Sequence, residues 1–181
     1  MDRRLGWLLT TTGAVGLVAA FVLTVEKVRL LQDPGYRPTC SINPILSCGS
    51  IMASDQAEAF GFPNPVLGLI GFTVVVTTGV AVLAGAVLPR WWWIGLQAGA
   101  VLGAVFVHWL FFQSVYRIGA LCPYCMAVWV VTIVICWYVT LHNFGRGRTV
   151  AKYHSTILTA WLLVLTALIG TEFWDFWRTL L

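Results

Sequence analysis

The chain has 181 residues, of which 59% are hydrophobic and only 10% are charged, and its net charge is +4. A soluble domain carries about 25% charged residues, so this composition excludes an ordinary soluble fold and favours a membrane protein. The positive charge does not indicate a nucleic-acid partner, because the basic residues lie at the ends of apolar runs, where membrane topology accounts for them.

Apolar runs of helical length predict an all-α integral membrane protein with one membrane domain over residues 1–181. About 20 apolar residues in a helix cross the roughly 30 Å hydrocarbon layer of a bilayer. The first run is too long for a removable signal peptide and no small-residue cleavage site follows it, so we retain it as a helix. The five predicted spans are residues 5–25, 66–88, 92–115, 122–141 and 155–175.

The placement of charged residues predicts the orientation of these spans. With the N-terminus inside, six basic residues oppose one acidic residue inside, and five basic residues oppose six acidic residues outside. The net charge is then about +5 inside and about −1 outside, as the positive-inside rule expects. Cys40, Cys48, Cys122 and Cys125 then lie on the outer face, which is oxidising at a bacterial plasma (inner) membrane and permits disulfides.

A long polar segment, residues 26–65, follows the first span and forms the predicted extracytoplasmic loop. A loop of this length is uncommon in a compact domain unless it has a function. Ser50 to Phe60 predicts a short amphipathic helix with Ser47 or Ser50 as its cap, and Gly61 can end it. Its apolar positions, expected on the membrane, are Ile51, Met52, Ala59 and Phe60, and those expected towards water are Asp55 and Glu58.

Asn64 and Pro65 open the second predicted span. Proline favours the first helical position and asparagine favours the N-cap, so Asn64 is placed at the outer border of the membrane, level with Cys122. A helix cap without further function is an equally good interpretation of Asn64 from the sequence alone.

Residues 89–90 form a very short predicted turn, which makes the second and third spans antiparallel neighbours. Three tryptophans, residues 91–93, predict an aromatic belt at the inner interface. Three glycines form two overlapping Gly-x-x-x-Gly motifs, which favour the close approach of another helix. These are Gly95, Gly99 and Gly103. His108 is a functional candidate because it lies within a span, although a hydrogen-bonded interior histidine without chemistry is the plainer interpretation.

The sequence Cys122-Pro123-Tyr124-Cys125 opens the fourth predicted span. Pro123 suits the first helical position, which makes Cys122 the N-cap. The positive end of the helix dipole there favours a thiolate. Cys125 lies about 4.5 Å deeper on nearly the same face, so one sulfur faces water and the other faces the lipid edge.

Residues further along the chain carry less specific signals. Cys136 lies about 16 Å beyond Cys125 along the helix, too far for a disulfide, and we interpret it as a small buried apolar residue. Trp129 lies one turn below Cys125 and either stacks on a bound molecule or simply packs. Residues 145–148 predict contact with anionic lipid, and residues 172–178 predict an outer aromatic girdle.

The two cysteine pairs can be interpreted separately or together. Alone, Cys40 and Cys48 indicate a structural disulfide, and Cys122 with Cys125 indicates a redox pair or a metal site. A zinc site would need four thiolates at one point, so the pairs together favour a relay by thiol–disulfide exchange. The sequence shows no dinucleotide fingerprint and no Cys-x-x-Cys-His haem motif. We therefore expect that the protein uses no nucleotide and no metal. We expect the electron acceptor to be a lipid-soluble quinone that reaches Cys125 from the bilayer.

Four motifs in this order resemble the vitamin K epoxide reductase family, and its bacterial homologues most closely. They are Cys40-Ser-Ile-Asn-Pro-Ile-Leu-Ser-Cys48, Ser54, Asn64-Pro-Val-Leu-Gly68 and Cys122-Pro-Tyr-Cys125. The resemblance covers about residues 5–142. It implies a four-helix transmembrane bundle around a quinone (menaquinone, ubiquinone or a vitamin K type), with a fifth transmembrane helix.

The resemblance also implies roles for individual residues. Cys40 and Cys48 are the expected shuttle pair, Cys48 exchanges with Cys122, and Cys125 faces the quinone. Asn64 is expected to donate a hydrogen bond to a quinone carbonyl, and Ser54 to assist in the loop. The other residues expected at the quinone are Met52, Phe60, Leu67, Gly68 and Trp129.

Two departures from the family pattern refine the expected function. Vertebrate members have a tyrosine where this chain has Trp129, which favours quinone reduction over epoxide reduction. Many bacterial members carry a fused thioredoxin-like domain, and since this chain has none we expect a separate periplasmic thioredoxin-fold (DsbA-like) partner. The alternatives are thiol-driven reduction of vitamin K epoxide or quinone, and a non-enzymatic membrane scaffold or metal-binding protein with structural cysteines.

Overall fold

The computed structural model describes residues 3–33, 35–43, 45–145 and 152–178, and its regular elements within those ranges are helices. Five helices are long and apolar enough to cross a membrane. They are α1 (Arg3–Gln32), α3 (Pro65–Leu83), α4 (Arg90–Phe112), α5 (Pro123–Phe144) and α7 (His154–Glu172), with α4 continued by the π-helix η2 (Gln113–Ile118). The shorter helices are α2 (Cys48–Met52), the 3₁₀-helix η1 (Asp55–Glu58) and α8 (Trp174–Arg178). The chain is therefore an all-α, multi-pass membrane protein.

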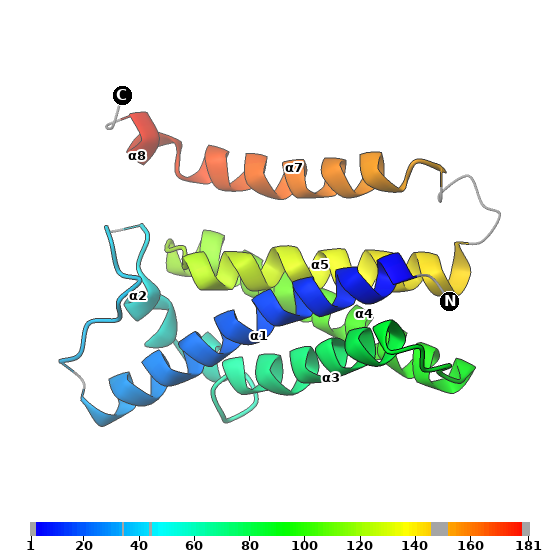
Figure 1. Ribbon diagram of the computed structural model, residues 1–181. Coiled ribbons are helices and arrows are strands. Elements are labelled where there is room, and N and C mark those ends of the chain that lie inside the picture. Colours follow the sequence, from blue (N-terminus) through cyan, green and yellow to red (C-terminus); the bar gives the residue numbers. More distant parts are fainter. Residues whose placement is uncertain (1–2, 34, 44, 146–151, 179–181) are drawn as a thin grey trace.

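Four of the long helices form a bundle, and the fifth lies beside it (Figure 1). α1 packs along both α3 and α5, and α4 packs along α5. The connection from α1 to α3, which contains α2 and η1, lies at one end of the bundle, next to the start of α5 (Figure 1). We call this end, defined by residues 33–64 and 119–125, the cysteine end.

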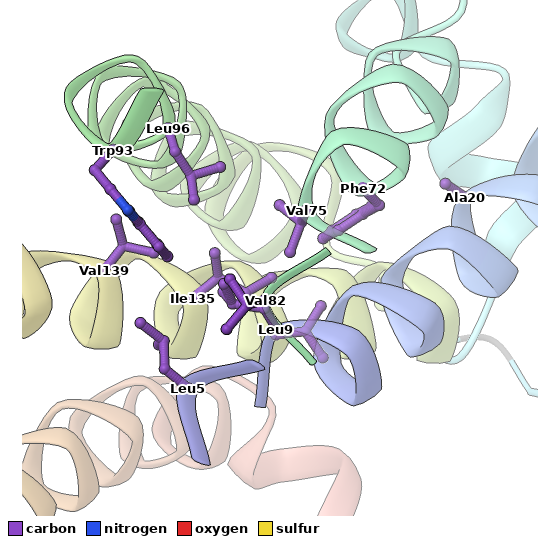
Figure 2. Close-up of a cluster of buried hydrophobic side chains, with 11 residues drawn as sticks. Leu5, Leu9, Ala20, Phe72, Val75, Val82, Trp93, Leu96, Ile135 and Val139 are labelled. Atoms are coloured by element: carbon purple, nitrogen blue, oxygen red, sulfur yellow. The ribbon is translucent and has the colours of Figure 1, made fainter. Parts of the chain in front are cut away.

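Apolar side chains from all four bundle helices meet in one core cluster (Figure 2). Leu9 of α1 and Val139 of α5 are fully buried in it, and Trp93 of α4 is 5% exposed. The burial of Trp93 corrects the prediction of an aromatic belt over residues 91–93. A belt requires exposed side chains, and of these three tryptophans only Trp91, at 70%, is largely exposed.

Glycine allows α1 and α3 to approach each other closely. A Cβ atom on Gly79 of α3 would lie 2.6 Å from the backbone nitrogen of Thr10 on α1, which is closer than real Cβ contacts come. The predicted close approach of a helix is wrong at two of the three glycines of α4. A Cβ on Gly95 or Gly99 would meet nothing within 4 Å. Gly95 and Gly99 therefore face open space, whereas a Cβ on Gly103 would lie 3.4 Å from Cγ2 of Thr132 on α5.

The second and third predicted spans make sparse contact with each other, through a hydrogen bond from Trp92 Nε1 to Thr78 Oγ1 at 3.2 Å and through the shared core cluster. α3 ends at Leu83, five residues earlier than predicted, and residues 84–89 rather than 89–90 connect it to α4. Gly85 in this connection has φ +90°, a conformation that glycine adopts without strain. The main packing partner of α3 is α1, and that of α4 is α5.

α1 extends seven residues beyond its predicted end, from residue 25 to Gln32. Leucine, glutamate, lysine and arginine dominate this extension, and all are good helix formers, so a charged sequence does not end the helix. Glu26 and Lys27 are buried, at 4% and 6% exposed, instead of lying in a solvated loop.

The single amphipathic helix predicted for residues 50–60 is also wrong, because the chain forms α2 and η1 with a break between them. Met52 is buried rather than laid on the membrane, at 4% exposed. Ser47 is the N-cap of α2, as predicted, and its Oγ accepts a hydrogen bond from the Ser50 N–H. Gly61 follows η1 with φ +79°.

The remaining predictions concern the inner loop and the C-terminal helices. The predicted lipid contact of Arg146 and Arg148 lies outside the described residues. α7 ends at Glu172 and α8 follows. In the predicted girdle, Trp174 is exposed but Phe173 is buried against the bundle.

Candidate active site

Cys122 is the N-cap of α5, as the sequence predicts. Pro123 takes the first helical position, and the sulfur of Cys122 accepts a hydrogen bond from the Cys125 N–H at 3.4 Å. A thiol at this position therefore faces the unpaired N–H groups of the first helical turn.

Backbone pairing brings the long connection onto the start of α5. Leu46 and Leu121 form an isolated parallel β-bridge. The Leu121 N–H donates to the Ile45 carbonyl at 2.7 Å, and the Ser47 N–H donates to the Leu121 carbonyl at 3.0 Å. Because Cys48 and Cys122 directly follow these paired residues, the bridge fixes the two cysteines beside each other.

Three sulfur atoms gather at this point. Cys40 and Cys48 form a disulfide with a Cα–Cα distance of 5.6 Å. The Sγ atom of Cys48 lies 3.0 Å from that of Cys122, and all three Sγ atoms lie within 4.8 Å of one another. Cys122 thus contacts the disulfide at Cys48, the sulfur that the family resemblance pairs with it.

The surroundings of Cys122 favour its thiolate. The Cys125 thiol, which donates a hydrogen bond to the Cys122 sulfur, is the largest influence that lowers the pKa of Cys122. The backbone N–H groups of Cys125 and Tyr124 lower this pKa further, against the opposing effect of burial. A hydrogen bond to the charged form stabilises that form, so the dithiol holds its negative charge on Cys122.

A cavity of about 510 Å³ opens beside the cysteines, between α3, α4 and α5. Cys125 lines it, and so do the three glycines of α4. The absence of side chains at Gly95, Gly99 and Gly103 keeps this space open, which gives the stripe of glycines a different consequence from the predicted helix contact. The volume lies in the range of about 300–1,000 Å³ that is typical of small-molecule sites.

Most of the residues predicted to contact a ligand line this cavity. They are Met52, Ser54, Asn64, Leu67, Gly68 and Trp129. Trp129 also packs edge-on against Phe111, with ring centroids 5.3 Å apart, so both of its predicted roles are compatible with its position. Phe60 is 61% exposed and does not line the cavity, although its ring lies 5.5 Å from that of Phe106, which does.

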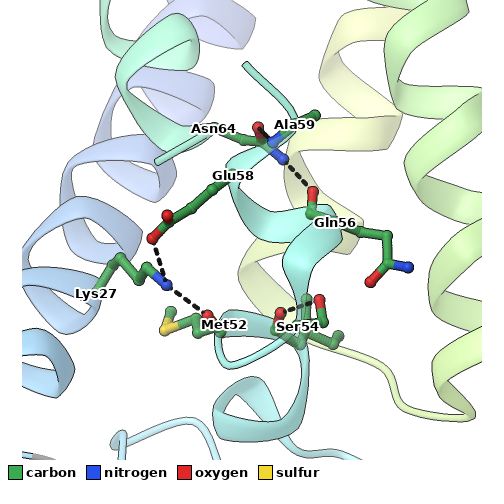
Figure 3. Close-up of polar contacts among 8 residues, drawn as sticks. Lys27, Met52, Ser54, Gln56, Glu58, Ala59 and Asn64 are labelled. Atoms are coloured by element: carbon green, nitrogen blue, oxygen red, sulfur yellow. Dashed lines mark hydrogen bonds and ion pairs between the residues drawn. The ribbon is translucent and has the colours of Figure 1, made fainter. Parts of the chain in front are cut away.

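Asn64 is the N-cap residue of α3, as predicted, but its side chain makes no capping hydrogen bond and holds the connection in place instead (Figure 3). Its Nδ2 donates to the Gln56 carbonyl at 2.7 Å, and its Oδ1 accepts from the Ala59 N–H at 3.1 Å. One of the two Nδ2 hydrogens is used in this way, so the amide keeps a donor for a ligand. Ser54 instead donates to the Ile51 carbonyl at 2.7 Å within the connection.

Sequence reasoning missed Lys27, which also lines the cavity. Its Nζ lies 2.7 Å from the Met52 carbonyl oxygen and 2.9 Å from Oε1 of Glu58 (Figure 3). The apolar residues Val28, Leu30 and Leu31 after Lys27 were the available signal, because they show that the helix continues with Lys27 on it.

His108 is not at the cysteine site. Its Nδ1 lies 2.7 Å from the Ala104 carbonyl oxygen, and its Nε2 accepts a hydrogen bond from Trp161 Nε1 at 3.0 Å. This arrangement fits the neutral tautomer with its proton on Nδ1. Cys136 is a free, buried cysteine, as predicted.

Comparison with known proteins identifies the family. The model of the vitamin K epoxide reductase family matches residues 7–140. This range covers the four bundle helices apart from residues 3–6 at the start of α1 and residues 141–144 at the end of α5. The search of curated proteins returned no significant match. The family works by thiol-dependent chemistry on quinones and disulfides, for which a cysteine cluster beside an apolar cavity is suited. The chain belongs to the vitamin K epoxide reductase family.

Proposed function

We propose that this protein is a quinone-dependent thiol–disulfide oxidoreductase that supports disulfide formation in a partner. The observation that carries the proposal is the 3.0 Å contact between Cys48 Sγ and Cys122 Sγ, together with the position of Cys125 on the cavity wall. The Cys40–Cys48 pair therefore lies in the loop, and the Cys122–Cys125 pair adjoins the apolar cavity through Cys125.

The exchange steps follow from the positions of the sulfurs. A partner dithiol reduces the Cys40–Cys48 disulfide and becomes a disulfide itself. The Cys48 thiolate then attacks an oxidised Cys122–Cys125 pair, which forms a Cys48–Cys122 bond and releases the Cys125 thiolate. Cys40 attacks Cys48, which restores Cys40–Cys48 and leaves both electrons on Cys122 and Cys125. The bonding in this structure, Cys40–Cys48 joined and Cys122 and Cys125 free, corresponds to this last state.

The cavity fits a quinone as the oxidant of the Cys122–Cys125 dithiol. A quinone supplies a two-electron, two-proton acceptor on a flat ring with two carbonyl oxygens. Apolar side chains and glycines provide the walls for such a ring, and the spare Nδ2 hydrogen of Asn64 provides a donor. Cys125, which lines the cavity while Cys122 is fully buried against Cys48, is the sulfur in reach of that oxidant.

The partner and the topology belong to the same proposal. We infer a separate periplasmic thioredoxin-fold protein as the source of electrons, a bacterial inner membrane as the location, and a cytoplasmic N-terminus. The charge distribution supports this orientation, because the net charge is then about +5 inside and about −1 outside, on the side of the cysteine end. The lipid bilayer then supplies the quinone from its hydrocarbon layer.

Thiol trapping of the reduced protein tests the proposal. The wild type and single variants at Cys40, Cys48, Cys122 and Cys125 are mixed with a short-chain quinone, and the remaining thiols are alkylated. We expect oxidation in the wild type and in the Cys40 and Cys48 variants, and none in the Cys122→Ala or Cys125→Ala variant. A membrane-impermeant thiol reagent, applied to whole cells, should label the reduced cysteine end if it faces outward.

Equal oxidation of all four variants, or of none, would contradict the proposed electron order. Cys136→Ala is the matched control, because Cys136 is a buried thiol remote from the sulfur cluster, and its loss should leave oxidation unchanged. Elemental analysis of the purified protein separates the zinc alternative, since stoichiometric zinc would require thiolates where the structure has a disulfide.

A further inference from the structure

Lys27 is the only charged residue among those that line the cavity in the described part of the chain. Its side chain is 8% exposed, and a buried ammonium in an apolar cavity is costly unless it is paired. Glu58 provides the pairing, and its own side chain is 38% exposed. The pair therefore connects the cavity wall with the solvent-accessible surface of η1 (Figure 3).

The ammonium group of Lys27 has hydrogen-bonding capacity to spare. It carries three N–H donors, and the contacts with the Met52 carbonyl and the Glu58 carboxylate use two of them. The third is available to a polar atom of a ligand in the cavity. A quinone carbonyl or the oxygen formed on its reduction is such an atom.

The position of Lys27 along α1 puts it near the sulfurs. Leu23, one helical turn earlier on the same face, packs in a cluster with Cys48, Met52 and Cys122, and it also lines the cavity. One turn is about 5.4 Å, so the Lys27 side chain starts about that far beyond the cluster. Cys125 and Lys27 thus flank the same end of the cavity.

We propose that Lys27 is the proton donor for quinone reduction and that Glu58 returns protons to it from water. This inference rests on the proposed function and adds a residue to it. Cys122 enters the step as a thiolate, Cys125 as a thiol, and Lys27 as an ammonium. The Cys122–Cys125 bond forms, two electrons leave the sulfurs, and the two protons come from the Cys125 thiol and from Lys27.

The protons and charges of this step balance. Before the step, the negative charge of the Cys122 thiolate and the positive charge of the Lys27 ammonium sum to zero. After the step, no group carries a charge, because the products are a disulfide, a hydroquinone and a neutral Lys27 amine. One proton from water, carried by the Glu58 carboxyl group, then restores the ammonium. The partner thiols, which react as thiolates, release protons to that water, so a full turnover consumes none.

Lys27 also anchors the connection through the Met52 carbonyl, so a test has to separate proton donation from anchoring. Lys27→Arg keeps the charge and the hydrogen-bond donors, but a guanidinium does not release its proton in a protein. We expect Lys27→Arg to slow oxidation of Cys122 and Cys125 by a short-chain quinone about 100-fold, the scale of a lost general acid. Exchange between the two cysteine pairs should stay within about twofold.

Three further measurements complete the test. Quinone binding, followed by quenching of the tryptophans that line the cavity, should be unchanged in Lys27→Arg. Glu58→Gln, which keeps a hydrogen-bond acceptor but cannot carry a proton, should slow the same half-reaction. Lys152→Arg is the matched control, since Lys152 precedes α7 and lies outside the cavity, and it should behave as the wild type.

The possible outcomes distinguish this inference from the proposed function. Oxidation of Lys27→Arg at the wild-type rate would show that Lys27 is only an anchor. Weaker quinone binding in Lys27→Arg would show that it positions the ligand, and either result overturns the relay. Failure of the wild type to be oxidised by any quinone would instead overturn the proposed function itself.

Discussion

The chemistry at the scale of single residues centres on Cys122, whose sulfur has contacts on two sides. The disulfide sulfur of Cys48 lies 3.0 Å away on one side, and the thiol and N–H of Cys125 lie on the other. A thiolate is the nucleophile in disulfide exchange, so the neighbour that stabilises its charge also sets its reactivity. Cys125 is therefore expected to influence exchange in addition to its proposed part in quinone reduction.

The pH dependence of Cys122 tests this arrangement. Its pKa is lowered, so its thiolate should be half formed at a lower pH than that of an ordinary thiol, near 8.5, and should be lost only as the pH falls through the lowered value. Ultraviolet absorbance of the thiolate can be titrated in a variant that lacks Cys40, Cys48 and Cys136. The Cys125→Ala substitution in that background removes the largest cause and should raise the midpoint.

An unchanged midpoint on loss of Cys125 would mean that the helix N-terminus alone lowers the pKa of Cys122. That result would remove the stated role of Cys125 in exchange. It would leave its position on the cavity wall unaffected, because that position rests on geometry.

The residue scale also shows which parts of the site can be predicted. Cys122 as the N-cap and Cys136 as a buried thiol follow from local rules, since proline and helical rise fix them within a few residues. The contacts of Asn64 and Lys27 do not follow, because their partners at Gln56, Met52 and Glu58 depend on how residues 52–59 fold over the bundle. Composition gives no signal for such a fold.

At the scale of elements, the loop that carries Cys40 is held against α1. Glu26, which lies on the part of α1 beyond the predicted end of the first span, accepts a hydrogen bond from Thr39 Oγ1 at 2.8 Å and from the Thr39 N–H at 3.4 Å. Cys40 and Cys48 are 5% and 0% exposed. A partner thiolate therefore cannot reach the disulfide unless this loop opens.

Thr39→Val should make the Cys40–Cys48 disulfide easier to reduce. The substitution removes a hydrogen bond to a charged group, worth about 1.5–3 kcal/mol, from the closed loop only. Since 1.4 kcal/mol corresponds to tenfold, we expect reduction by an external dithiol to be at least about tenfold faster. The rate is measured by trapping the released thiols at intervals.

Thr73→Val is the control for Thr39→Val, because the exposed Thr73 hydroxyl on α3 donates only within its own helix, to the Leu69 carbonyl. Equal reduction rates in all three proteins would show that opening of the loop does not limit access. Slower reduction in Thr39→Val would be the opposite of the prediction.

Sequence patterns at this scale predicted the number of spans but not their packing. The glycines of α4 have the spacing of a helix contact, yet a Cβ on Gly99 would meet nothing within 4 Å, while Gly79, which no motif marked, sits against Thr10. The spacing of small residues shows which face of a helix lacks bulky side chains. Whether that face meets a helix or a cavity depends on where the neighbouring helices are held.

At the scale of the whole molecule, the cysteine site and the cavity are built from α1 to α5, and α7 contributes no residue to the cavity lining. The family match, residues 7–140, ends before α7 begins at His154. α7 has no buried residue of its own. Its side chains reach α4 through the hydrogen bond from Trp161 to His108 and through Leu165 and Ile169, which pack against the cluster that contains Val107 and Phe111. The hydrogen bond accounts for the histidine within a span by packing alone.

Trp161→Phe should therefore loosen α7 without affecting the chemistry. Phenylalanine keeps the apolar ring but cannot donate to Nε2 of His108, and hydrogen bonds between helices in membranes are worth about 0.6 kcal/mol on average. We expect a small fall in thermal stability in detergent, with quinone oxidation of Cys122 and Cys125 within about twofold of the wild type. Trp174→Phe is the control, because Trp174 is 57% exposed on α8 and its loss should leave stability unchanged. A large loss of quinone oxidation in Trp161→Phe would mean that α7 supports the cavity, and His108 would then belong to the functional machinery after all.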